Sequence, residues 1–251
     1  MDNTQAVIEP RRGKREEPLP PVAVLIFTPQ DVEFFIRCLP SPPRRTHKLF
    51  LVDVYTCQVG EETAIALAGP VLGAPQAVMV VERLVALGVR RIVAVGWCGS
   101  LQPHVAVGDV VLPTGAISEE GTSAHYPLVE GRDPGPAPGL LSSLRESLLS
   151  RSLRIHEGRV WSTDAPFRET VGKVSTYQKE NILAVDMETS ALFTLAAFRS
   201  FELAVAMVVS DDLSSLKWVH GFRDRRFKEA REILARTTFD VVCSTIGRLS
   251  T

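Results

Sequence analysis

The chain has 251 residues, of which 45% are hydrophobic, and its formal net charge is −1. These values are typical of one large globular domain, or at most two, and the small net charge gives no support for a nucleic-acid partner. No apolar run reaches the roughly 20 residues that a membrane-spanning helix needs, so we expect no membrane partner either. The four cysteines include no C-x-x-C pair, which favours unlinked thiols in a reduced cytoplasm.

The first 21 residues combine basic residues and prolines without an apolar core, a composition unlike that of a secretory signal. We expect residues 1–21 to form a disordered tail. Residues 22–251 are expected to form one domain.

The first half of the domain alternates short apolar runs with helical patterns. We expect strands at residues 22–27, 49–59, 63–68 and 92–95, helices at residues 32–39 and 77–87, and a glycine- and proline-rich loop at residues 69–75. Gly88 is placed to end the second helix, because glycine readily adopts the left-handed conformation found there. Strands that alternate with helices favour an α/β sheet over a sandwich.

The second half continues this pattern. We expect strands at residues 110–112, 159–162 and 204–209, a loop at residues 130–139, and helices at residues 140–149, 184–199 and 223–249. The strand at 204–209 is followed directly by Ser210, Asp211 and Asp212. Ligands bind at the carboxyl ends of strands in open α/β sheets, so these carboxylates are candidates for a binding site.

Residues 185–188 read V-D-M-E, residues 95–101 read V-G-W-C-G-S-L, and residues 121–126 read G-T-S-A-H-Y. These three segments resemble the nucleoside phosphorylase family, which includes purine nucleoside phosphorylases, uridine phosphorylases and adenosylhomocysteine-type nucleosidases. Residues 185–188 read V-D-M-E where the family has V-E-M-E before a helix, and Ser210-Asp211 matches its S-D at the next strand end. Residues 95–111 fit V-G-[ST]-C-G-x-L-x-P-x-V-x-x-G-D-V-V at most positions, and residues 121–126 resemble G-T-S-x-H-Y of the phosphorylase branch. The resemblance extends from about residue 22 to the last helix. It implies a single α/β domain with a twisted, mixed β-sheet flanked by helices.

The resemblance also implies roles for individual residues. Glu188 would bind the ribose hydroxyls, Met187 would pack on the sugar, and Asp211, preceded by Ser210, would protonate or hydrogen-bond the base. An alternative from the residues alone is that Asp186 and Glu188 are acids that favour a helix N-terminus.

Two further segments are expected at the substrate. Cys98 and Gly99 lie in the glycine-rich string after the central strand, where the backbone can approach a ligand closely. In the segment that takes the position of the family's base pocket, Phe167 is the candidate for stacking on a base and Arg168 for hydrogen-bonding it.

The positions that hold phosphate in the family are changed. Thr28 lies in the turn after the first strand, which has neither the family's glycine nor its arginine; Ala94 replaces the central-strand arginine, and Trp97 replaces a serine or threonine. Charge-assisted contacts bind a phosphate dianion strongly, and all three of these supports are missing. Lys48 is the phosphate-binding candidate, with Arg44 and Arg45 as alternatives, near the position where the family reaches into the neighbouring subunit's site. Trp97 is expected to close the phosphate pocket, to stack on the substrate, or to fill space that the anion left.

An ungapped comparison of the first strand and turn with the nucleosidase pattern places Asp31 where those hydrolases have the glutamate that activates water. Asp31 is therefore a candidate general base. The alternative is an acid in the first turn of a helix.

Three functions follow from these features. The first is a nucleoside phosphorylase, a pentosyltransferase that uses inorganic phosphate as co-substrate and needs no cofactor or metal. The second is a hydrolytic nucleosidase that uses Asp31, and the third is a nucleoside-binding protein without catalysis. The family resemblance also predicts a small-molecule nucleoside as partner and a homo-oligomer (dimer, trimer or hexamer).

Overall fold

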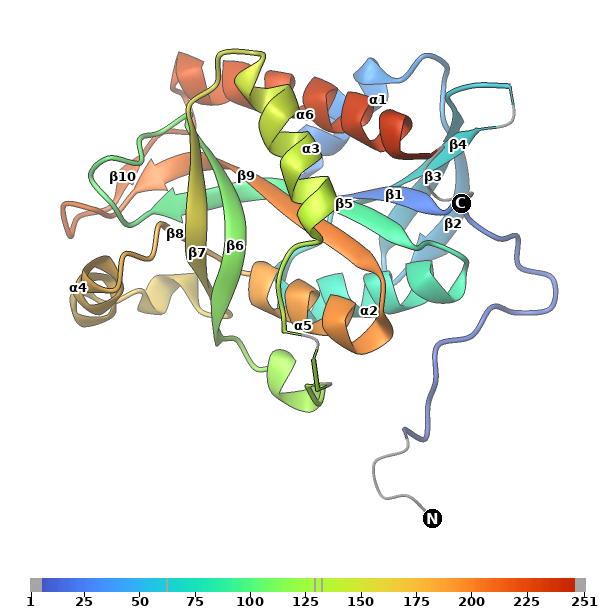
Figure 1. Ribbon diagram of the computed structural model, residues 1–251, viewed down its shortest axis with the longest axis horizontal. Helices are drawn as coiled ribbons and strands as arrows, with labels where there is room; N and C mark the ends of the chain where they lie inside the picture. The colour runs from blue at the N-terminus through green and yellow to red at the C-terminus, as the bar shows by residue number, and fades with distance from the viewer. Residues whose placement is uncertain (1–5, 62, 129, 132, 247–251) are drawn as a thin grey trace.

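The computed structural model describes residues 6–61, 63–128, 130–131 and 133–246 and has one large mixed sheet between two layers of helices (Figure 1). The strands are β1 (Val22–Ile26), β2 (Arg44–Leu49), β3 (Val52–Gln58), β4 (Ala64–Gly69), β5 (Arg91–Ser100), β6 (Val110–Glu119), β7 (Ile155–Thr163), β8 (Ala184–Asp186), β9 (Glu202–Asp212) and β10 (Val219–His220). The helices are α1 (Pro29–Cys38), α2 (Gly73–Ala86), α3 (Pro138–Leu149), α4 (Val171–Lys179), α5 (Thr189–Arg199) and α6 (Arg225–Thr245), with short 3-10 turns η1 (Ser123–His125) and η2 (Pro166–Arg168). The predicted fold class is confirmed.

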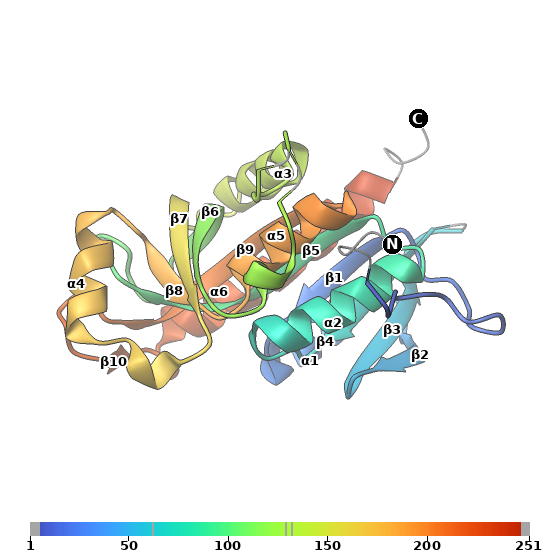
Figure 2. The same cartoon turned by 90° about the horizontal axis from the view of Figure 1, so that it is seen from below.

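The sheet order is β10-β9-β6-β7-β8-β5-β1-β4-β3-β2, and β5 also pairs with β9. The second pairing closes β5, β9, β6, β7 and β8 into a ring, from which β1, β4, β3 and β2 extend as an open sheet. Helices α1, α3 and α6 cover one face and α2 and α5 cover the other, as the two views show (Figure 1, Figure 2). Covered on both faces, β1, β5 and β9 are almost continuously apolar and buried.

The boundaries of several elements differ from those expected. Residues 184–186 form β8, and the buried helix begins at Thr189, because Asp186 accepts hydrogen bonds from the Thr189 N–H and hydroxyl and ends the strand. Strand β9 continues through Asp212 because its last residues pair with β5 and β10. Helix α2 begins inside the expected loop, at Gly73, whose φ of 77° suits glycine.

Four of the strands and helices, β2, β8, β10 and α4, have no counterpart among the expected elements. Strand β2 carries four basic residues and pairs only with β3 at the edge of the sheet, and β8 is too short for a pattern to show. Helix α4 is largely polar on its surface, and its N-terminus is capped by the Thr170 hydroxyl. Residues 132 and 247–249, which belong to the expected loop and last helix, lie outside the described residues.

The predicted disordered tail stays a prediction for residues 1–5, which lie outside the described residues. From Glu9 onward the chain makes defined contacts with the domain. Leu19 is 6% exposed and donates its N–H to Leu87, and Glu16 pairs with Arg83 at 2.5 Å. Within the described ranges, no helix is both long and apolar enough to cross a membrane.

Candidate active site

A cavity of about 200 Å³ lies where β1, β5, β8 and β9 end. It brings together residues that the sequence separates widely, and seven of the predicted site residues line it: Trp97, Cys98, Gly99, Met187, Glu188, Ser210 and Asp211. A larger cavity of about 680 Å³ lies between α1 and α6 and is lined by none of the predicted site residues. The smaller cavity is therefore the candidate site.

Glu188 occupies the N-cap position of α5 and is 5% exposed. Its Oε1 accepts the N–H of Gly73 at 2.6 Å, which joins the start of α5 to the start of α2. Burial, and then the negative charge of Asp186, raise the pKa of Glu188 to about 8. The side chain that accepts the helix N–H groups is Asp186, so Glu188 remains directed to the cavity and Gly73.

Asp211 lies at the end of β9 and lines the same cavity as Glu188, from a different part of the chain. Its Oδ1 lies 2.6 Å from the Ser210 hydroxyl, and its Oδ2 accepts the indole N–H of Trp218 at 2.9 Å. Arg225, on the exposed face of α6, pairs with Glu229. Trp218 carries no sequence signal that links it to Asp211.

Glu169, which precedes the cap of α4, also lines the cavity. Burial, and then the charge of Asp211, raise the pKa of Glu169 to about 7. The described residues around this cavity thus include four carboxylates, from Glu169, Asp186, Glu188 and Asp211, and no lysine, arginine or histidine. Apart from the neutral thiol of Cys98, the titratable side chains of this lining are thus all carboxyl groups.

Asp31 is not among the residues that line the cavity. It is 6% exposed, lies in the first turn of α1, and pairs with Arg231 of α6, whose Nε donates to Oδ1 at 2.7 Å. Its Oδ2 accepts the Trp97 indole N–H and the Thr28 hydroxyl, each at 2.7 Å. The structure therefore does not support Asp31 as a general base, because its carboxylate is occupied by three donors behind the cavity wall.

Trp97 forms part of that wall. One side of the residue lines the cavity, and the Arg231 guanidinium lies 4.6 Å from its ring centroid. Phe227 packs edge-on against the indole with the centroids 5.1 Å apart. Trp97 thus contacts the cavity on one side and the Asp31–Arg231 pair on the other, and its three expected roles stay predictions.

Three predicted site residues lie elsewhere. Phe167 and Arg168 lie in η2 and are both exposed, Phe167 completely. Lys48 is exposed on the edge strand β2, which β3, β4 and β1 separate from β5. None of the three lines the cavity.

The glycine-rich string at the end of β5, residues 96–100, has a packing role and also lines part of the cavity. A Cβ on Gly99 would lie 2.7 Å from Leu213 and 3.1 Å from the Asp211 carboxylate, so glycine permits close approach of the two strand ends. Cys98 is 3% exposed, and burial raises the pKa of its thiol well above the ordinary value, which makes it a neutral wall residue.

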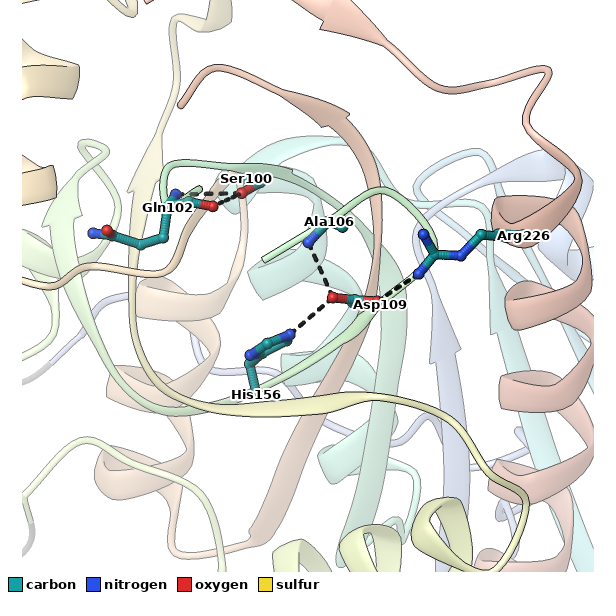
Figure 3. Close-up of polar contacts among 6 residues, drawn as sticks. All are labelled: Ser100, Gln102, Ala106, Asp109, His156 and Arg226. Atoms are coloured by element: carbon teal, nitrogen blue, oxygen red, sulfur yellow. Dashed lines mark hydrogen bonds and ion pairs between the residues drawn. The ribbon is translucent and has the colours of Figure 1, made fainter. Parts of the chain in front are cut away.

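The loop from β5 to β6 is fixed by Asp109, which is 1% exposed (Figure 3). The carboxylate accepts the N–H of Ala106 at 3.0 Å, lies 2.9 Å from His156 Nε2, and accepts from Arg226 at 3.0 Å. These contacts join the loop to β7 and α6. The G-D pair of the motif is thus a structural anchor for the loop that follows β5.

The chain was compared with known proteins. The family model described as the phosphorylase superfamily matches residues 21–247. A guanosine phosphorylase of Halorubrum lacusprofundi is 33% identical over 151 residues, covering 60% of this chain and 62% of that protein. A DeoD-type purine nucleoside phosphorylase of Geobacillus kaustophilus is 32% identical over 152 residues, covering 59% and 63%.

A crystal structure of uridine phosphorylase from Vibrio fischeri has a TM-score of 0.80 at 22% identity and covers 96% of this chain and 99% of that one, which shows the shared fold. The curated relatives are matched over less than two thirds of their own length. The family model, in contrast, spans nearly the whole domain from before β1 to the end of α6. The chain belongs to the phosphorylase superfamily.

Proposed function

We propose that the chain cleaves the N-glycosidic bond of a nucleoside and transfers the ribosyl group to phosphate. The observation that carries this proposal is the meeting of Glu188 and Asp211 at one cavity at the strand ends. The names of the matched relatives, guanosine phosphorylase and purine nucleoside phosphorylase, support phosphate as the acceptor.

In this reaction positive charge develops on the ribose as the bond to the base breaks. The carboxylate of Glu188 is suited to accept hydrogen bonds from the ribose hydroxyls, and Met187 beside it supplies an apolar contact for the sugar. Carboxylates fixed around the cavity before the reaction stabilise the positive charge as it forms. Asp211 and Glu169 also line the cavity, and their carboxyl groups are the candidates for contact with the base.

Hydrolysis is the second candidate, and a specific observation favours it. No cation lines the described cavity, and the arginine that lies behind Trp97, Arg231, is neutralised by Asp31. A phosphate dianion in an acidic cavity is repelled, whereas water is neutral. Water is thus the acceptor that the acidic lining admits more readily.

We also propose a homo-oligomer in the cytoplasm. Leu51, Leu72 and Phe167 are 85%, 73% and 100% exposed, and contact with further copies of the chain would remove this apolar surface from water. The four cysteines are free thiols, in keeping with a reducing compartment. Light scattering coupled to size-exclusion chromatography tests the oligomer, and a monomer at micromolar concentration would contradict it.

The reaction is tested by release of free base from purine and pyrimidine nucleosides, with and without phosphate. Release that depends on phosphate, with ribose 1-phosphate as product, is the expected result. Release at the same rate without phosphate, with free ribose as product, would replace phosphorolysis by hydrolysis. Binding of nucleosides without any release of base would favour the third function, a nucleoside-binding protein without catalysis.

A further inference from the structure

Asp211 is engaged as a hydrogen-bond acceptor on the side facing Trp218. An indole N–H can donate but cannot accept, so Oδ2 of Asp211 acts as an acceptor at 2.9 Å. The Ser210 hydroxyl lies at 2.6 Å from the other oxygen, Oδ1, and also 3.3 Å from the Cys98 carbonyl. This environment suits a carboxylate that accepts hydrogen bonds and holds a ligand in place.

Glu169 has the opposite environment. Its carboxyl group accepts no hydrogen bond from the residues that the structure describes, and its surroundings are the cavity, partial burial and the negative charge of Asp211. Two carboxylates that face one small space do not both ionise readily, and the proton resides on the one with the poorer solvation. Of Glu169 and Asp211, that group is Glu169, whose pKa is raised to about 7. Burial also raises the pKa of Glu188 and of Asp186, which face the same cavity, but these two accept backbone N–H groups at the starts of α2 and α5.

The backbone fixes Glu169 in this position. The N–H of Glu169 donates to the Pro166 carbonyl, which closes η2, and the next residue, Thr170, caps α4 through its hydroxyl. The backbone of Glu169 is thus held between η2 and α4 at the cavity wall. A proton donor needs such a fixed position within reach of the leaving group.

We propose that Glu169, rather than Asp211, donates the proton to the departing base, and that Asp211 positions the base as a hydrogen-bond acceptor. This inference rests on the proposed cleavage of a nucleoside. The C1′–N bond breaks and its electron pair goes to the base, which takes the proton of Glu169. The acceptor, hydrogen phosphate or water, forms the new C1′–O bond and loses one proton, which restores Glu169.

The test compares two substrates in the wild type and in Glu169→Gln. A neutral nucleoside needs a proton on its leaving base, whereas an N7-methylated purine nucleoside in its cationic form releases a neutral base without one. Glu169→Gln is expected to lower kcat for the neutral nucleoside by about 100-fold or more and to leave the cationic substrate within about threefold. Glu169→Asp, which keeps a carboxylic acid, is expected to restore part of the rate.

The pH dependence gives a second readout on the neutral nucleoside alone. The wild-type rate is expected to fall as pH rises through about 7, because Glu169 loses its proton there, and Glu169→Gln is expected to lack this limb. The control is Glu180→Gln, the same change at an exposed position at the end of α4, which should alter neither rate nor profile.

Equal losses on both substrates, or a falling limb that persists in Glu169→Gln, would overturn the assignment. A selective loss in Asp211→Asn with full activity of Glu169→Gln would return the role of donor to Asp211. Absence of cleavage of either substrate by the wild type, with phosphate or without it, would instead refute the proposed function and this inference with it.

Discussion

Removal of Arg231 tests the interpretation that the buried ion pair behind Trp97 is electrostatically compensated. The Arg231 and Asp31 side chains are 8% and 9% exposed, and α6 contributes the arginine to an aspartate 200 positions away in the sequence. In Arg231→Met the apolar stem is retained, while the charge on Asp31 is left buried with two neutral donors, from Trp97 and Thr28.

Breaking a buried pair in this way costs about 3–5 kcal/mol of unfolding free energy, because the remaining charge is uncompensated. The two neutral hydrogen bonds that Asp31 retains favour the lower end of this range, and loss of the guanidinium stacking on Trp97, at 4.6 Å, favours the upper. For a domain of this size the thermal midpoint is expected to fall by roughly 6–20 °C. The double variant Asp31→Asn/Arg231→Met removes both charges and should recover most of the loss.

Guanidinium denaturation followed by fluorescence and circular dichroism measures these differences. Arg225→Met is the matched control, since that arginine is exposed on the same helix in a pair with Glu229 and its loss should leave the midpoint unchanged. An Arg231→Met protein as stable as the wild type, or a double variant no more stable than the single one, would refute the account of a compensated buried pair.

Three further predictions concern the site and its support. Because the pKa of Glu188 is raised from its ordinary 4.5 to about 8, the folded state holds the proton more tightly, and stability should fall as pH rises from about 4.5 to 8; thermal midpoints across this range should fall less in Glu188→Gln. Asp109→Ala leaves donors of Ala106 and Arg226 without their acceptor and should cost about 1–3 kcal/mol in denaturant unfolding, whereas the exposed Glu146→Ala should cost less than about 0.5 kcal/mol. Phe167→Ala should leave both stability and KM nearly unchanged, since the ring is fully exposed; a KM raised tenfold would show that its loop closes on the base.

The central elements of the fold were predictable because their patterns are strong. Strands β1 and β9 are continuous apolar runs, a pattern typical of strands in a sheet covered by helices on both faces. The apolar periodicity of residues 223–249 predicted helix α6 over nearly its whole length. Strand β2 was not predictable in the same way. It is exposed at the sheet edge, so its basic residues carry no alternating apolar signal.

The site was predictable where it follows from strand ends and missed where it depends on tertiary contacts. Asp211 follows a buried strand and Glu188 begins a buried helix, so both could be placed at one sheet edge. The pairing of Asp31 with Arg231 is determined by how α1 and α6 pack, and nothing local to either residue indicates it. Trp97 contacts both members of that pair. The surroundings of Trp97 could therefore not be inferred from the sequence.

The most direct test of the central claim is the rate of base release from nucleosides by the wild type, measured beside Glu188→Gln. The account predicts release by the wild type and a loss of about 100-fold or more in the variant, with the fold intact by circular dichroism, because the carboxylate that contacts the ribose hydroxyls is absent. No release by the wild type from any nucleoside, or equal rates in the two proteins, would contradict it.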